Sequence, residues 1–128
     1  MKTRIRSFGI CMAGLFILAI AFSCSNFSQG AYNALNVSKA QYTATLTTAG
    51  ELYQEGKITD ATKAEFIKYG NLYMAAHNEA VDALLDYQMA TLEQKPDTKA
   101  VYLQIADKVA EHLADLLAYL RKWKGGAQ

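Results

Sequence analysis

The chain has 128 residues, of which 52% are hydrophobic, and its 13 basic and 12 acidic residues give a formal net charge of +1. This length suits one compact domain of ordinary size. A charge so close to zero argues against nucleic-acid binding, which requires a clustered basic surface.

The first two dozen residues have the pattern of a secretory signal peptide. Basic residues at positions 2, 4 and 6 precede an apolar run over residues 8–22, and Ser23 and Cys24 follow it. A charged start, a short apolar middle and a small residue at the cleavage site are the parts of such a leader. The run is shorter than the roughly 20 residues that a transmembrane helix needs. We therefore predict a cleaved signal peptide over residues 1–23.

The residues before Cys24 resemble the lipobox of bacterial lipoproteins. In Ile20-Ala21-Phe22-Ser23-Cys24 small residues precede the cysteine, although Phe22 is bulkier than the residue usual at its position. The resemblance implies that Cys24 is acylated, becomes the mature N-terminus and anchors the protein in a membrane. By the sorting pattern of enterobacterial lipoproteins, Ser25 in place of an aspartate implies an outer-membrane lipoprotein that faces the periplasm. An uncleaved N-terminal anchor and plain secretion are the alternatives.

Cleavage before Cys24 changes the charge and the cysteine chemistry of the chain. It leaves 10 basic and 12 acidic residues, a formal net charge of −2, and it removes Cys11, the other of the two cysteines. With Cys24 acylated, no thiol is free to react or to form a disulfide. The following residues lack an apolar period and contain Ser, Asn, Gln and Gly, so we predict an acylated N-terminus and short tether over residues 24–34.

The rest of the chain, residues 35–126, has the periodicity of amphipathic helices and essentially no strand signals. Apolar residues recur at steps of three, four and seven between residues 35 and 56, and Gly56 is a natural helix stop. Four threonines and Gly50 lower the helix propensity of this stretch. We predict the first helix over residues 35–56.

The second helix is predicted over residues 60–94. Thr59 is a potential N-cap, and a capping box formed by Thr62 and Glu65 is an alternative start. Pro96 disfavours helical conformation at the residue before it, so this helix is expected to end before the proline.

The third helix is predicted over residues 97–124, with Asp97 or Thr98 as its N-cap and two glycines at positions 125 and 126 as its stop. Three amphipathic segments joined by short links pack as antiparallel neighbours. The predicted fold is therefore all-α, an up-down-up three-helix bundle.

A hairpin centred near residue 58 predicts which residues face each other across the first two helices. It places Gly50 near Phe66 and Gly70 near Leu46, so that each glycine makes room for a large side chain. The alternative is that both glycines are tolerated defects, which cost about 1 kcal/mol each relative to alanine.

His77 and His112 lie on the apolar stripes of the second and third predicted helices. A turn near residue 96 would place the two imidazoles within about one helical turn of each other, and facing helices of bundles often carry metal or haem ligands. However, the chain has no Glu-x-x-His repeat, Cys-x-x-Cys-His or His-Glu-x-x-His motif. A metal- or haem-binding periplasmic carrier is therefore the alternative function. We prefer structural histidines and predict no cofactor besides the lipid on Cys24.

The end of the third helix carries Arg121, Lys122, Trp123 and Lys124. Cations at this position complement the helix dipole, which is their structural interpretation. In an up-down-up bundle anchored at its start, this end lies about 30 Å or more from the lipid, so these residues do not easily reach their own membrane. The functional hypothesis is contact with an envelope protein, with peptidoglycan or with a second copy of the chain.

No sequence pattern indicates catalysis. The chain has no Gly-x-Ser-x-Gly elbow and no phosphate-binding glycine loop, and no serine of the helical region has a histidine spaced to activate it. We predict a lipid-anchored protein of the bacterial cell envelope that is a small helical binding or structural module and not an enzyme.

Overall fold

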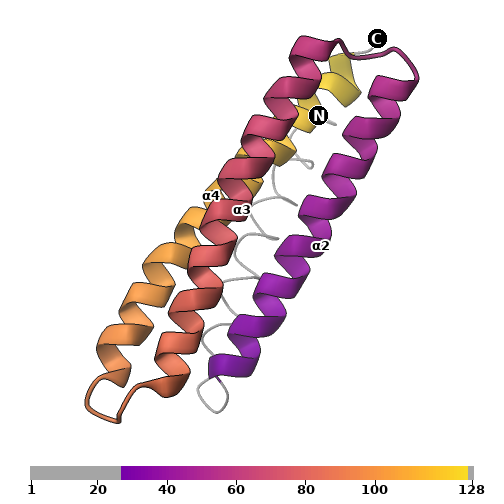
Figure 1. Cartoon of the computed structure of the whole chain (residues 1–128). Coiled ribbons are helices and arrows are strands. Elements are labelled where there is room, and N and C mark those ends of the chain that lie inside the picture. The colour runs from indigo at the N-terminus through magenta and orange to yellow at the C-terminus, as the bar shows by residue number, and fades with distance from the viewer. Residues whose placement is uncertain (1–26, 127–128) are drawn as a thin grey trace, which may run out of the picture. The chain divides into compact units, whose positions relative to one another are not determined.

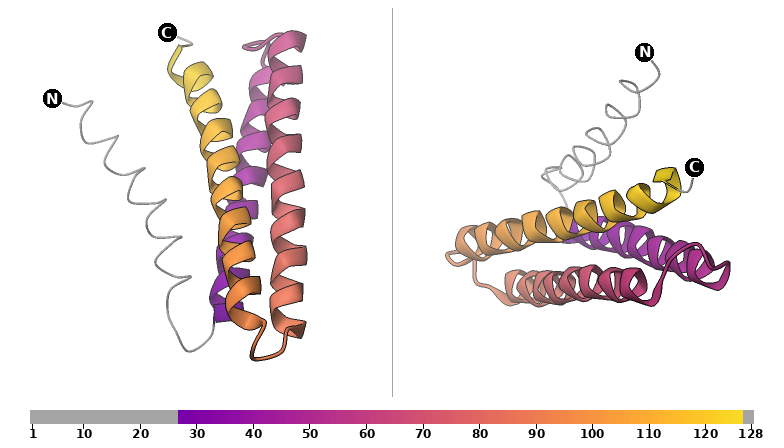
Figure 2. Two further views of the ribbon diagram at one scale, coloured as in Figure 1. Left: turned by 90° about the vertical axis from the view of Figure 1, so that its left-hand side faces the viewer. Right: turned by 90° about the horizontal axis from the view of Figure 1, so that it is seen from above.

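The computed structural model describes residues 27–126, which form three α-helices and no strands (Figure 1). These helices are α2 (Phe27–Gln54), α3 (Asp60–Met89) and α4 (Lys95–Gly126). From Val37 onward, where the second of two compact units begins, consecutive helices run antiparallel and lie side by side (Figure 2). The predicted all-α, up-down-up three-helix bundle is confirmed, while the predicted signal peptide and Cys24 lie outside the described residues.

α2 begins earlier than predicted. It starts at Phe27 instead of residue 35, so the tether predicted over residues 24–34 is wrong where the structure describes it. Phe27, Ala31 and Ala34 are buried, and steps of four and three place them on one helix face. Alanine is also the strongest helix former. The polar residues of this segment concealed its helical period.

The corner between α2 and α3 follows the prediction. Gly56 has a φ of 70°, a left-handed conformation that glycine adopts without strain. The N–H of Lys57 donates to the carbonyl of Leu52 at 2.9 Å, the bond that closes a Schellman motif. Thr59 is the N-cap of α3, and its hydroxyl accepts a hydrogen bond from the N–H of Thr62 at 3.3 Å. The alternative start at Thr62 is therefore wrong.

The link between α3 and α4 lies earlier than predicted. α3 ends at Met89 instead of residue 94, and α4 begins at Lys95 instead of residue 97. The N–H of Thr91 donates to Oε1 of Gln94 at 3.3 Å, which is half of a capping box. Pro96 lies in the first turn of α4, where its missing N–H needs no helical partner.

The predicted caps Asp97 and Thr98 are wrong, because both lie inside α4. The hydroxyl of Thr98 donates to the carbonyls of Gln94 and Lys95, both at 3.1 Å, so it bonds the backbone of its own helix. α4 continues to Gly126 instead of ending at residue 124.

The threonine-rich part of α2 is helical because its hydroxyls bond the helix backbone. Thr45, Thr47 and Thr48 donate to the carbonyls four residues earlier, at 2.8, 2.9 and 3.0 Å. These bonds satisfy the hydroxyl groups without interrupting the helical hydrogen-bond ladder.

The two helix-interior glycines have different surroundings. A Cβ on Gly70 would lie 3.4 Å from Cε2 of Tyr42 and 3.5 Å from Cδ1 of Leu46, which confirms that Gly70 lies near Leu46. A Cβ on Gly50 would meet nothing within 4 Å, and Gly50 is exposed. The prediction that Gly50 accommodates Phe66 is therefore wrong, since Gly50 lies on the solvent side of α2.

Small residues allow α4 to approach α3 closely. Ala76 and Ala83 follow Tyr69 at intervals of seven residues and are buried, and the Tyr69 ring lies 5.1 Å from that of Tyr119 on α4. A spacing of seven keeps residues on one helix face. The alanines therefore lie on the side of α3 that packs against α4, where methyl side chains leave room for a neighbouring backbone.

Candidate functional site

The candidate partner site lies at one end of the bundle, which we call the far end: the α2–α3 corner with the last turns of α4. Its interior is a buried cluster formed by Ala49, Leu52, Ile58, Phe66 and Leu116. Ile58, a residue of the corner itself, is only 5% exposed. The corner and the end of α4 are thus held together by apolar packing, as the up-down-up topology predicts.

Aromatic rings cover this cluster. Tyr119 lies 4.7 Å from Phe66 in an edge-to-face arrangement, and 6.3 Å from Trp123, between ring centroids. Trp123 is half-buried and packs against the far-end cluster. Its Nε1 is buried and has no hydrogen-bond partner among the residues that the structure describes. Trp123, predicted as a contact residue, therefore has a packing role here.

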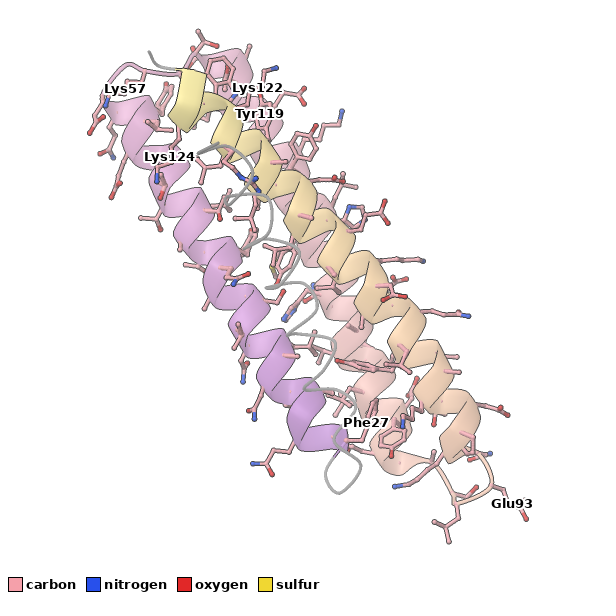
Figure 3. The ribbon with its side chains drawn as sticks, turned by 180° about the vertical axis from the view of Figure 1, so that it is seen from behind. Phe27, Lys57, Glu93, Tyr119, Lys122 and Lys124 are labelled. Atoms are coloured by element: carbon pink, nitrogen blue, oxygen red, sulfur yellow. The ribbon has the colours of Figure 1, made fainter. Side chains whose placement is uncertain are left out.

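The three cations beside Trp123 are exposed. Arg121, Lys122 and Lys124 form no ion pair with any residue of the described range. Figure 3 shows Lys57, Lys122 and Lys124 at the same end of the bundle, opposite Glu93. Exposed cations around an aromatic cap can attract an anionic surface and still complement the dipole of α4.

Tyr53 connects the corner to the first turn of α3. Its hydroxyl donates to Oδ1 of Asp60 at 2.7 Å, and Nζ of Lys63 lies 4.2 Å from the ring centroid. The hydrogen bond to Asp60, together with the negative charge of this carboxylate, raises the pKa of Tyr53. The phenol therefore stays neutral and keeps the corner fixed against α3.

A buried polar pair, which the sequence analysis did not identify, links α2 to α3. Oγ of Ser38 and the hydroxyl of Tyr73 lie 2.7 Å apart, and the Tyr73 side chain is fully buried. The ring of Tyr42 stacks on Tyr73 at 4.6 Å. Burial raises the pKa of Tyr73, while the bond to Ser38 acts in the opposite direction. The two residues are 35 positions apart, so no local pattern reveals the pair.

The two histidines lie on different helix interfaces. His77 is buried 5.7 Å from the ring of Tyr73, and it follows Gly70, which faces α2, by seven residues. His112 is half-buried and precedes Tyr119, which faces α3, by seven residues. One belongs to the α2–α3 interface and the other to the α3–α4 interface, an arrangement that does not favour one ion between them.

Two further features bear on metal binding and membrane association. No group of three or more His, Cys, Asp or Glu side chains within the described range could hold a metal ion. Among α2, α3 and α4, none combines the length and the apolarity that crossing a bilayer requires.

Comparison of the chain with protein-family models, curated proteins and solved structures finds no match.

Proposed function

We propose that this chain is a lipid-anchored protein of the bacterial cell envelope, and that its helical bundle is a non-catalytic binding or structural module. The observation that carries the proposal is the position of Cys24. It directly follows a short apolar leader and precedes Phe27, the first residue of α2, by three positions. In this proposal the acylated cysteine becomes the N-terminus of a chain that enters its helical domain almost at once.

The anchor accounts for how a small bundle would stay at a membrane. Each buried methylene group contributes about 0.8 kcal/mol, and two or more acyl chains hold a protein stably where one binds only reversibly. A multiply acylated Cys24 would therefore retain the bundle at the outer membrane, facing the periplasm, without a membrane-spanning helix.

The test of the anchor uses the two cysteines as a matched pair. Cells expressing the full chain are labelled with an alkyne fatty acid, and the membrane-extracted protein is analysed by intact mass. We expect a 105-residue chain that carries lipid, since cleavage before Cys24 removes 23 of 128 residues. Cys24→Ala should lose the label and the membrane association, whereas Cys11→Ala should keep both. An unmodified thiol at position 24, or a retained leader, refutes the proposal.

The far end is the proposed contact surface for an envelope protein or a second copy of the chain. The support is that Arg121, Lys122 and Lys124 are exposed and unpaired within the described range, beside a rigid aromatic cap. Reversal of these three charges to glutamate should abolish partner capture in crosslinking from native membranes. Reversal of Lys39 on α2 and Lys108 on α4, exposed lysines away from the far end, is the control. Equal capture by both variants contradicts this surface.

A further inference from the structure

The two connections between helices differ in the burial of their apolar side chains. At the α2–α3 corner, Ile58 is 5% exposed and belongs to the buried cluster. At the α3–α4 link, Leu92 is 87% exposed and Met89 is 79% exposed. Leu85, four residues before Met89 and on the same face of α3, is also exposed. We call Leu85, Met89 and Leu92 the apolar tip.

Burying such side chains is favourable, so large exposed apolar groups gathered at one place indicate a surface that another phase or molecule covers. Leu92 and Met89 are the two most exposed large hydrophobic residues of the described chain, and they are three positions apart. An accidental exposure would not be expected to concentrate at one link while the other link buries its isoleucine.

The residues beside the apolar tip suit a membrane interface. The half-buried Tyr87 lies two residues before Met89, and Nζ of Lys95 lies 4.9 Å from the Tyr87 ring centroid. Tyrosine rings are enriched at the level of lipid headgroups, and lysine stems cover apolar surface while their charge stays in water. A tyrosine and a lysine therefore border the exposed apolar side chains.

The chain enters the bundle from the side of this tip. α2 runs antiparallel to α3, and the hydrogen bond between Ser38 and Tyr73 places these two residues at the same level of the bundle. Met89 lies 16 residues after Tyr73, which is about 24 Å along α3 towards the tip. The 14 residue steps from Cys24 to Ser38 can span about 21 Å at the helical rise, and more when extended. The length of chain before Ser38 thus allows an anchor on Cys24 and the apolar tip to reach the same membrane surface.

We propose that the apolar tip inserts into the periplasmic leaflet of the bilayer that holds the lipid anchor, so that the bundle contacts the membrane at two points. This inference rests on the proposed lipid anchor. Two contacts would fix the orientation of the bundle and hold the far end away from the lipid. A single acylated cysteine would leave the bundle free to rotate about its attachment.

The test measures the accessibility of introduced thiols. With Cys24 acylated and Cys11 removed, a cysteine placed in the bundle is the sole thiol of the chain. We compare Leu92→Cys with Lys122→Cys at the far end and with Glu93→Cys as a charged neighbour in the same link. The full-length, membrane-extracted proteins are reconstituted in vesicles of phosphatidylethanolamine with a minor share of phosphatidylglycerol. They then react with a membrane-impermeant maleimide.

We expect Leu92→Cys to react about tenfold more slowly than Lys122→Cys, after each rate is divided by that of the urea-unfolded chain. Glu93→Cys should show much less protection. Leu92 is almost fully exposed, so its replacement leaves the packing of the bundle intact. Quenching by brominated lipid of a bimane dye on the same cysteine gives an independent measure of insertion.

The outcomes separate the two proposals. Acylated protein in which Leu92→Cys and Lys122→Cys react equally fast overturns insertion and leaves the anchor standing. Protein whose intact mass shows an unmodified Cys24 overturns both. Protection of Leu92→Cys that disappears when the protein is diluted in excess lipid indicates coverage by a second copy, and it also overturns insertion.

Discussion

The buried bond between Ser38 and Tyr73 should make a measurable and asymmetric contribution to stability. Both groups lie inside the α2–α3 interface, 2.7 Å apart. Tyr73→Phe leaves the Ser38 hydroxyl, which can turn to a carbonyl of its own helix as Thr45 does. Ser38→Ala instead leaves the Tyr73 hydroxyl on a fully buried ring, with no backbone acceptor of its own helix within reach.

The magnitudes follow from this difference. A net hydrogen bond contributes about 1 kcal/mol, whereas a buried polar group left without a partner costs about 1–3 kcal/mol. We therefore expect Tyr73→Phe to lower the free energy of unfolding by about 1 kcal/mol and Ser38→Ala by about 2 kcal/mol. The double variant, with no polar group stranded, should cost less than the sum, giving a coupling of about 1–2 kcal/mol.

The assay is urea unfolding of the wild type, both single variants and the double variant, followed by far-ultraviolet circular dichroism. These four proteins form a double-mutant cycle. The higher helix propensity of alanine cancels in the coupling energy, because Ser38→Ala is made once in the wild type and once in the Tyr73→Phe variant. Coupling below about 0.5 kcal/mol, the range of independent sites, would show that the bond contributes nothing specific. A Tyr73→Phe cost above that of Ser38→Ala would refute the argument about the stranded hydroxyl.

Three further predictions use the same unfolding assay. Gly50→Ala should stabilise the chain by about 1 kcal/mol because Gly50 is exposed within a helix, whereas Gly56→Ala should destabilise it by about 1 kcal/mol because φ is 70° there. Changes in the free energy of unfolding that have the same sign for both variants would contradict the assigned conformations. Gly70→Ala should be tolerated, since its Cβ meets Tyr42 at 3.4 Å, but Gly70→Leu should cost about 1–3 kcal/mol by overpacking; a neutral leucine would exclude close packing. Burial raises the pKa of Tyr102 from 10.0 to about 12, so the contribution of the neutral phenol to the free energy of unfolding is complete below pH 10 and falls by about 3 kcal/mol as the pH rises through 12. Tyr102→Phe should remove this part of the decrease in stability at alkaline pH. An unchanged dependence of stability on pH in this variant would contradict the raised pKa.

The sequence predicted best what neighbouring residues decide among themselves. Gly56 and Thr59 end one helix and begin the next through bonds that span at most five residues, and both were identified correctly. The predicted position of the α3–α4 link is wrong because Leu92 continues the apolar period of α3 and because a proline such as Pro96 is typical of a helix end. The proline instead lies in a first helical turn, where the backbone needs no N–H donor.

Properties of the candidate sites that depend on distant residues could not be predicted in the same way. The sequence indicated that Trp123 stands at the end of a helix among cations, but its packing against the cluster around Ile58 requires the antiparallel return of α4. The surroundings of His77 and His112 could not be predicted for a related reason. The predicted turn near residue 96 lies about four residues after the centre of the observed link, which shifts the facing residues by about eight positions, and spacing alone does not tell which interface each imidazole enters.

The two ends of the bundle expose different side chains, which favours one orientation of the bundle relative to a membrane. At the far end, Ile58 is buried and aromatic rings close the core, while charged side chains of both signs, among them Glu55, Lys57 and Lys122, are exposed. At the α3–α4 link, the side chains of Met89 and Leu92 are instead exposed. A bundle surrounded by water on all sides gains nothing from leaving one link apolar, because burial of a leucine is favourable. A bundle held to a membrane by its first residues gains a second contact from that link and keeps its charged end free for a partner.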